Sequence, residues 1–174
     1  MTSSKPSVAI YMGSDSDLPT MAEAARVLAR IGVPFEVEVT SAHRSPGRTV
    51  ELVRTAPDRG VHVFIVGAGA AAHLAGVVAA HTTLPVLGVP LAGSDLQGLD
   101  ALLSTVQMPA GIAVGTLAIG KAGAANAGWL AASILALADP ELAGRLAAER
   151  RAMADKVAAR SAAARGKLVD LLAE

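Results

Sequence analysis

The chain has 174 residues, no cysteine, and 15 basic residues that balance 15 acidic ones. This length fits a single domain with a sizeable core. The zero net charge excludes the basic surface of a nucleic-acid-binding protein, and the missing cysteines exclude disulfides and thiolate metal sites. Only 2% of residues are aromatic, whereas 38 are alanine. Small side chains bury little area each, so we expect the chain to associate with copies of itself.

Two stretches bear on membranes and location. Residues 1–7 are mostly polar and lead into a short apolar run, so no secretory signal is visible there. Residues 122–138 carry no charge, but they are mostly alanine and glycine and contain Asn126 and Ser133. This stretch is at the short limit for a membrane span and predicts a buried helix. We therefore expect a cytoplasmic protein without a membrane partner.

Strand and helix patterns alternate from the start of the chain. Residues 8–13 form a short apolar run that predicts a first strand. Residues 21–29 carry apolar side chains at helical spacing, and Gly32 and Pro34 end that helix. Residues 35–40 alternate apolar and mostly acidic side chains, which predicts an edge strand exposed on one face.

The alternation continues through the middle of the chain. Ser45 and Pro46 predict the start of a helix that runs to about residue 59. Residues 61–66 are apolar and β-branched, as expected of a central parallel strand. Two further strands and two further helices are predicted at 84–89, 112–119, 73–81 and 96–106. This order predicts a parallel five-stranded sheet with helices on both faces.

The last part of the chain predicts one long helix from Asp139-Pro140 towards the C-terminus. Its charges are dense and its apolar positions sparse, and about 30 helical residues would span roughly 45 Å. Such a helix either frays beyond Gly166 or packs on a neighbouring subunit. We expect a single domain over residues 1–174, with a core at 8–138 and an extension at 140–174 that packs on a neighbour.

Ligands of parallel α/β sheets collect where the strands end, so the residues after each strand are candidates. Gly13, Ser14 and Ser16 follow the first strand and suit a phosphate cradle. Asp15 and Asp17 would repel a phosphate, although one of them could hold ribose hydroxyls. The alternative is that this segment only caps the next helix.

The next two strands are followed by further candidates. Arg44 offers bidentate phosphate recognition and His43 can move a proton, unless their segment is simply a solvated loop. Residues 67–73 form a turn with almost no side chains, which either binds a carboxylate through its amides or serves packing. His62 and His81 are interpreted as structural or exposed, and Lys121 receives no role. No spacing of histidine and carboxylate residues indicates a metal site.

Six motifs in this order resemble one family over about residues 8–138. The motifs are Gly13-Ser14-Asp15-Ser16-Asp17, Ser41-Ala42-His43-Arg44, Gly67-Ala68-Gly69 with Ala72-His73-Leu74, Pro85-Val86-Leu87-Gly88-Val89-Pro90, Gln107-Met108-Pro109 with Gly111, and Gly115-Thr116-Leu117-Ala118-Ile119 with Asn126-Ala127. Each is weak alone, but the ordered set is specific. It resembles the class I PurE family, the 5-(carboxyamino)imidazole ribonucleotide mutases of purine biosynthesis.

The resemblance implies a fold, an assembly and a reaction. The fold would be a flavodoxin-like three-layer α/β/α sandwich, and the assembly a homo-octamer. The reaction would move a carboxylate from the exocyclic nitrogen of 5-carboxyaminoimidazole ribonucleotide to a ring carbon, giving 4-carboxy-5-aminoimidazole ribonucleotide. No metal or cofactor is implied, and the pathway partner would be the synthetase that makes the substrate.

The resemblance also implies roles for nine residues. Four would bind the substrate phosphate: Ser14, Ser41 and Arg44, with Ser16 adding to them. Asp17 would take the ribose hydroxyls and His43 would carry the proton. Gly69 and Ala70 would face the migrating carboxylate or the released carbon dioxide, with His73 nearby as a second catalytic residue.

Three positions depart from the family pattern. Ala70 stands where the family often has glycine, so its methyl group would narrow the turn or change its backbone angles. Ala75 replaces a frequent proline, and His81 replaces a frequent lysine. Two other functions stay open: direct carboxylation of aminoimidazole ribonucleotide, as in class II enzymes, and non-catalytic binding of a phosphorylated ligand.

Overall fold

A computed structural model describes residues 5–172 of the chain. The chain divides into two compact units, Met1–Leu135 and Ala136–Glu174. The first unit contains five strands: β1 (Val8–Met12), β2 (Phe35–Val39), β3 (Val63–Gly69), β4 (Val86–Leu91) and β5 (Gly115–Thr116). Its helices are η1 (Asp15–Asp17), α1 (Leu18–Arg30), α2 (Pro46–Arg59), α3 (Leu74–Ala80), α4 (Leu99–Val106) and α5 (Lys121–Leu135).

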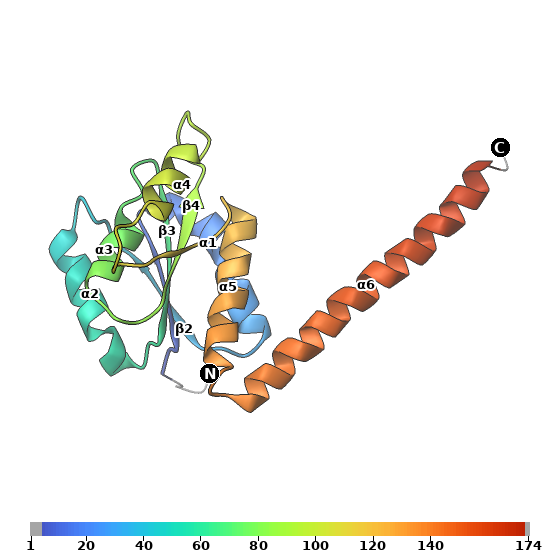
Figure 1. Ribbon diagram of the computed structural model, residues 1–174, viewed down its shortest axis with the longest axis horizontal. Helices are drawn as coiled ribbons and strands as arrows, with labels where there is room; N and C mark the ends of the chain where they lie inside the picture. The colour runs from blue at the N-terminus through green and yellow to red at the C-terminus, as the bar shows by residue number, and fades with distance from the viewer. Residues whose placement is uncertain (1–4, 173–174) are drawn as a thin grey trace. The chain divides into compact units, whose positions relative to one another are not determined.

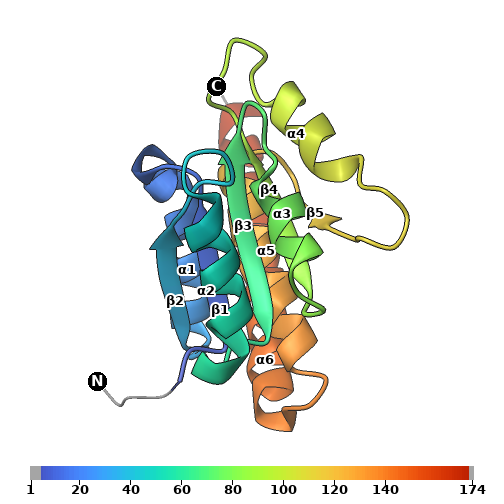
Figure 2. The same cartoon turned by 90° about the vertical axis from the view of Figure 1, so that its left-hand side faces the viewer.

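The strands form one parallel sheet in the order β2-β1-β3-β4-β5, which is a flavodoxin-like order and confirms the predicted parallel five-stranded sheet. Helices α1 and α5 pack together on one face, while α2, α3 and α4 cover the other (Figure 1 and Figure 2). β1, β3 and β4 are buried along almost their whole length. The predicted three-layer sandwich is therefore present, with its core on both sides of the three central strands.

Three strands differ in extent from their predicted ranges. β3 begins two residues later than expected and includes 67–69, which were predicted as part of a turn. These residues remain strand because they pair with β4, Gly67 opposite Val89 and Gly69 opposite Leu91. β4 is likewise shifted by two residues. β5 has only two residues, although Leu117 and Gly120 still donate backbone hydrogen bonds to β4.

β2 is the edge strand that the sequence predicts. An alternating pattern normally places the apolar face against the protein, but here the acidic face is the covered one. The acidic face packs under α2, because Arg59 and Arg48 pair with Glu36 and Glu38. The apolar face is the open one, with Val37 41% and Val39 44% exposed. Charge pairing with α2 therefore decides which face of this strand is covered.

Small residues let α5 approach its neighbours closely. A side-chain carbon on Gly128 would stand 3.0 Å from the Ala24 carbonyl oxygen of α1. One on Gly67 of β3 would stand 2.4 Å from the Met21 sulfur. The uncharged stretch around α5 is therefore a closely packed helix of the globular unit. Within residues 5–172, no helix is long and apolar enough to cross a membrane.

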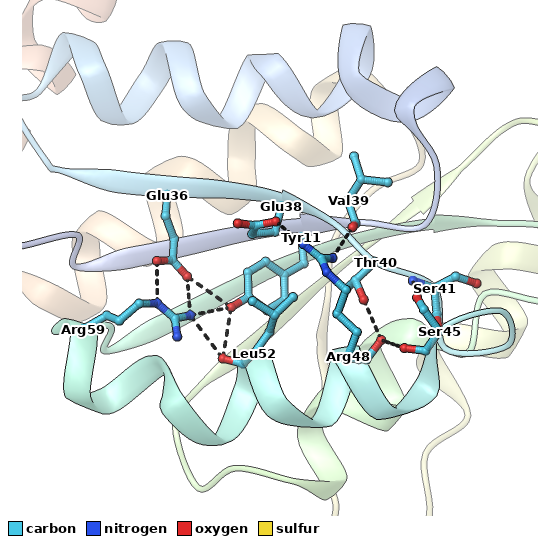
Figure 3. A network of polar contacts seen from close by, with 11 residues as sticks. Tyr11, Glu36, Glu38, Val39, Thr40, Ser41, Ser45, Arg48, Leu52 and Arg59 are labelled. Atoms are coloured by element: carbon cyan, nitrogen blue, oxygen red, sulfur yellow. Dashed lines mark hydrogen bonds and ion pairs between the residues drawn. The ribbon is translucent and has the colours of Figure 1, made fainter.

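A partly buried polar cluster ties α2 to the sheet (Figure 3). Arg59 donates two hydrogen bonds to the Glu36 carboxylate, at 2.9 and 2.7 Å. The Tyr11 hydroxyl lies 3.1 Å from Glu36 and 3.3 Å from the Leu52 carbonyl oxygen. The Arg59 hydrogen bonds hold the pKa of Glu36 below its usual range against the effect of burial. Burial and the adjacent Glu36 charge raise the pKa of Tyr11.

The second unit is dominated by α6 (Pro140–Leu172), which continues past Gly166. Its 33 residues correspond to roughly 50 Å of helix. Apolar side chains recur at eleven-residue spacing, which keeps them on one stripe of a nearly straight helix. The stripe consists of Leu142, Leu146, Met153, Val157 and Leu168. Val157 and Leu168 are 65% and 55% exposed.

The Glu36–Arg59 pair predicts an acid-sensitive contribution to stability. Since the folded-state pKa of Glu36 is lowered, its contribution is present above the ordinary pKa of glutamate. It disappears as the pH falls through the lowered value. We expect Glu36→Gln to cost about 1–3 kcal/mol of unfolding free energy at neutral pH. It should also flatten the loss of stability in acid, measured by urea unfolding at several pH values.

Glu38→Gln is the matched control, because the Glu38–Arg48 pair is more exposed, at 37% and 49% against 19% and 32% for Glu36 and Arg59. We expect that control to lose no more than about 1 kcal/mol. Equal losses in the two variants would contradict a special role for the Glu36 cluster.

Candidate active site

The loops after β1, β2 and β3 meet in one cleft of about 350 Å³. All nine residues predicted from the sequence line it: Ser14, Ser16, Asp17, Ser41, His43, Arg44, Gly69, Ala70 and His73. The parallel register explains this convergence, because Met12 pairs with both Val39 and Gly67 and the three strands end at the same edge of the sheet. The placement of the nine residues is thus observed, while their roles remain predictions.

The first loop is both a helix cap and a wall of the cleft. The Ser14 amide donates to the Asp17 carboxylate at 3.0 Å, and the Ser14 hydroxyl accepts from the Ser16 amide at 3.3 Å. This is the reciprocal capping that one of the two interpretations predicted. Burial raises the pKa of Asp17; its hydrogen bond from Ser14 opposes that shift, and the Asp15 charge adds to it.

The second loop, between β2 and α2, contains a tight five-residue turn, Ser41–Ser45. The Ser41 hydroxyl accepts hydrogen bonds from the amides of His43 and Arg44, at 3.3 and 3.1 Å. Ser45 closes the turn, since its amide donates to the Ser41 carbonyl at 3.0 Å. The Ser45 side chain does not cap α2 but bonds to the Ser41 backbone. The turn therefore fixes the backbone of His43 and Arg44, which carry the imidazole and guanidinium groups of this loop.

Two histidines from different loops meet in the cleft. His43 Nε2 lies 2.8 Å from His73 Nδ1, and the rings are perpendicular. One of these nitrogens must donate and the other accept, so one hydrogen is shared at this contact. As long as the bond persists, the two rings cannot both be imidazolium ions. The pair is therefore suited to store and return a single proton.

Arg44 gives the cleft its positive charge. Its guanidinium donates to the Gly13 carbonyl oxygen at 3.2 Å, which spans the second and first loops. The side chain is exposed and faces the same cleft as the hydroxyls of Ser14 and Ser41. A guanidinium beside hydroxyl groups and helix-terminal amides is a typical setting for a phosphate group.

The third loop begins with a residue in an unfavourable backbone conformation. Ala70 has a φ of 51°, in the left-handed region that normally favours glycine. The methyl group of Ala70 therefore does not prevent a positive φ, which costs about 1 kcal/mol for a residue other than glycine. The following turn is closed by a bond from the His73 amide to the Ala71 carbonyl at 2.8 Å. The strained turn brings His73 to the start of α3.

Several cleft residues were not among the predicted ones. Gly93 follows β4, so the same rule of strand ends would have found it if applied to the fourth strand. The others outside the nine are Gly13, Ala42, Ala68, Ala71 and Leu74, which have no polar or charged side chain. His81 lines a larger hollow of about 880 Å³ beside Arg54 and Pro85, which contains none of the nine residues.

Metal ligands do not gather around the cleft. Across the part of the chain that the structure describes, no three histidine, aspartate or glutamate side chains are grouped to hold a metal ion. The cleft instead offers two imidazoles, one guanidinium, hydroxyls and backbone amides. Groups of these kinds can bind anions and transfer protons.

Comparison with known proteins shows which family the chain resembles in sequence. The family model described as AIR carboxylase matches residues 7–156. N5-carboxyaminoimidazole ribonucleotide mutase of Vibrio vulnificus (strain CMCP6) is 56% identical over 152 residues, covering 87% of this chain and 94% of that protein. The protein of the same name from Pyrococcus horikoshii is 54% identical over 155 residues, covering 89% of this chain and 85% of the relative.

Solved structures give the same result. The crystal structure of Treponema denticola PurE matches with a TM-score of 0.79 and 28% identity, over 87% of this chain and 94% of that one. The crystal structure of a substituted form of Treponema denticola PurE2 matches with a TM-score of 0.83 and 25% identity, over 91% and 98%. From the matched model and the curated relatives together, the chain belongs to the AIR carboxylase (PurE) family.

Proposed function

We propose that this chain is a mutase that converts 5-carboxyaminoimidazole ribonucleotide to 4-carboxy-5-aminoimidazole ribonucleotide in purine biosynthesis. The observation that carries the proposal is the 2.8 Å contact between His43 and His73 in the cleft that also holds Arg44. Curated relatives that share more than half of their aligned residues with this chain bear the mutase name.

The chemistry needs one proton and a closed space. A proton given to the exocyclic nitrogen breaks its bond to the carboxyl carbon and releases carbon dioxide beside the amine. The electron-rich ring carbon then attacks carbon dioxide and forms the new carbon–carbon bond. Loss of the proton from that ring carbon restores aromaticity, so the proton count balances. His43 gives the first proton and takes the last, and His73 shares it.

The rest of the cleft holds the substrate. Arg44, Ser14 and Ser41 take the phosphate, with Ser16 beside them, and Asp17 accepts the ribose hydroxyls. The backbone at Gly69 and Ala70 faces the migrating carboxylate. Holding carbon dioxide next to the ring carbon is a matter of proximity, which is a large contribution that such a site can make.

Substrate choice tests the proposed reaction. We expect turnover of 5-carboxyaminoimidazole ribonucleotide and little turnover of aminoimidazole ribonucleotide with low bicarbonate, in the absence of ATP and the synthetase. Ultraviolet absorbance of substrate and product provides the measurement. Efficient carboxylation at low bicarbonate would instead assign the class II reaction, and turnover of neither substrate would favour a binding module.

The His43→Asn variant is the companion measurement, since asparagine keeps a polar side chain but cannot transfer a proton. We expect kcat to fall by roughly 10²- to 10⁴-fold with the fold retained. Unchanged turnover in this variant would contradict the role of His43 as proton carrier.

Arg44→Ala should weaken substrate binding by about 2–3 kcal/mol, because charge-assisted bonds to the phosphate are lost. Titration calorimetry with product measures this loss. Arg48→Ala is the control: Arg48 lies four residues further along, at the start of α2, and pairs with Glu38 outside the cleft. An Arg44→Ala variant with unchanged affinity would refute the phosphate role.

The proposal extends to assembly and setting. The enzyme acts in the cytoplasm as a homo-octamer and receives its substrate from the synthetase of the preceding step. Exposed apolar side chains support association: Met153, Val157 and Leu168 of the stripe on α6, and Leu96, Leu99, Leu103 and Val106 at and before α4. The α6 helix packs on a neighbouring copy through its stripe, as its length and sparse apolar positions suggest.

Light scattering tests the assembly. We expect a mass about eight times that of the 17.4 kDa chain. Val157→Glu, on the stripe, should reduce that mass, while Ala159→Glu, roughly 200° around the helix axis, should not. A stable monomer of the unmodified chain at micromolar concentration is incompatible with this proposal.

A further inference from the structure

The turn that carries His43 and Arg44 is bracketed by two buried threonines. Thr40 precedes the turn and is 2% exposed, and Thr49 follows it on α2 and is fully buried. Their hydroxyl oxygens lie 2.8 Å apart. Threonine hydroxyls are seldom buried without purpose, because a hydroxyl removed from water costs free energy unless it is hydrogen-bonded.

The direction of these hydrogen bonds follows from counting protons. The Thr49 hydroxyl donates its single hydrogen to the Ser45 carbonyl oxygen, at 3.2 Å. It must therefore accept from Thr40, whose hydroxyl is the donor of the 2.8 Å bond. The result is a chain of hydrogen bonds from Thr40 through Thr49 to the last residue of the turn.

Both ends of the turn are thereby tied to rigid elements. Thr40 is held to the sheet by its amide, which donates to the Met12 carbonyl oxygen at 2.9 Å. Ser45 is held by Thr49. The Ser45 hydroxyl in turn accepts a hydrogen bond from the Ser41 amide and donates one to the Ser41 carbonyl oxygen. A shift of Ser45 would thus move the whole segment between the two threonines.

We propose that Thr40 and Thr49 are positioning residues of the active site, which hold the Ser41–Ser45 turn so that His43 reaches His73. This inference rests on the proposed function for its kinetic consequences. The histidine contact joins two loops at 2.8 Å, and a displacement of less than 1 Å on one side breaks it. Catalytic groups generally need placement within about half an ångström, which a solvent-exposed turn does not hold by itself.

Two substitutions at position 49 separate hydrogen bonding from packing. Thr49→Val keeps the shape and removes the hydroxyl, whereas Thr49→Ser keeps the hydroxyl and removes a methyl group. We expect kcat to fall by roughly 10- to 100-fold in the valine variant and to stay near the original value in the serine variant. If the residue only filled space, the order of the two variants would be reversed.

Thr105→Val provides a matched control. Thr105 is also a buried helical threonine, 3% exposed, and its hydroxyl donates to the Ala101 carbonyl at 2.7 Å, as Thr49 does to Ser45. It lies on α4 and does not line the cleft. Both valine variants should lose similar stability in urea unfolding, but only Thr49→Val should lose turnover. Equal kinetic effects in the two variants would overturn the positioning role.

A second readout does not depend on turnover. The ring resonances of His43 and His73 in an NMR spectrum report their contact directly, while His62 and His81 serve as internal references. We expect the first pair of signals to move in Thr49→Val and to remain unmoved in Thr49→Ser and Thr105→Val. Unmoved signals in Thr49→Val overturn the inference. A wild-type enzyme that lacks mutase turnover would refute the proposed function but leave this measurement decisive for the turn.

Discussion

The parallel register of β1 with β2 and β3 is the constraint on which the site depends. Met12 is opposite Val39 on one side and Gly67 on the other, so the first two strands end level and the third runs only two residues further. Each following loop then starts from the same edge. Groups separated by 30 residues, such as His43 and His73, can meet at hydrogen-bond distance because backbone ladders fix where their loops begin.

Level strand ends are necessary for the cleft but not sufficient. A register positions a loop to a few ångströms, whereas the histidine contact needs much finer placement. Different local devices supply it in the three loops: reciprocal capping by Ser14 and Asp17, the hydroxyl brace around Ser41–Ser45, and the left-handed residue Ala70. Each device acts over a few residues and changes the free energy by only a small amount. Together they determine the shape of the three loops.

The sequence predicted most of the architecture because its signals are local. Periodicity located the helices, and the alternation of strands and helices predicted a parallel sheet covered on both faces. The strand boundaries were wrong by about two residues at β3 and β4, since glycines at 67 and 69 were interpreted as a turn. They are instead strand residues, and at Gly67 a side chain would collide with the Met21 sulfur. The need for glycine at position 67 comes from the packing of α1 against β3, so it cannot be predicted from the residues of β3 alone.

The covered face of β2 could not be predicted for a similar reason. Alternation says that two faces differ, but the partner of each face lies elsewhere in the chain. Arg59 sits 23 positions after Glu36, and its charge makes the acidic face the buried one. The candidate site residues were easier to find, because ends of strands are marked in the sequence and their side chains carry distinctive chemistry.

The few aromatic residues of the chain lie outside the cleft. Tyr11 and Phe64 pack edge to face in the core, with ring centres 5.5 Å apart, and no phenylalanine, tyrosine or tryptophan lines the cleft. Without these side chains, recognition of a ligand in the cleft falls mainly to charge and hydrogen bonds. Those interactions are directional, and they lose strength quickly when a donor moves. A ring-poor cleft therefore places a higher demand on the rigidity of its loops than a stacking site would, and the buried threonines behind the His43 turn meet that demand.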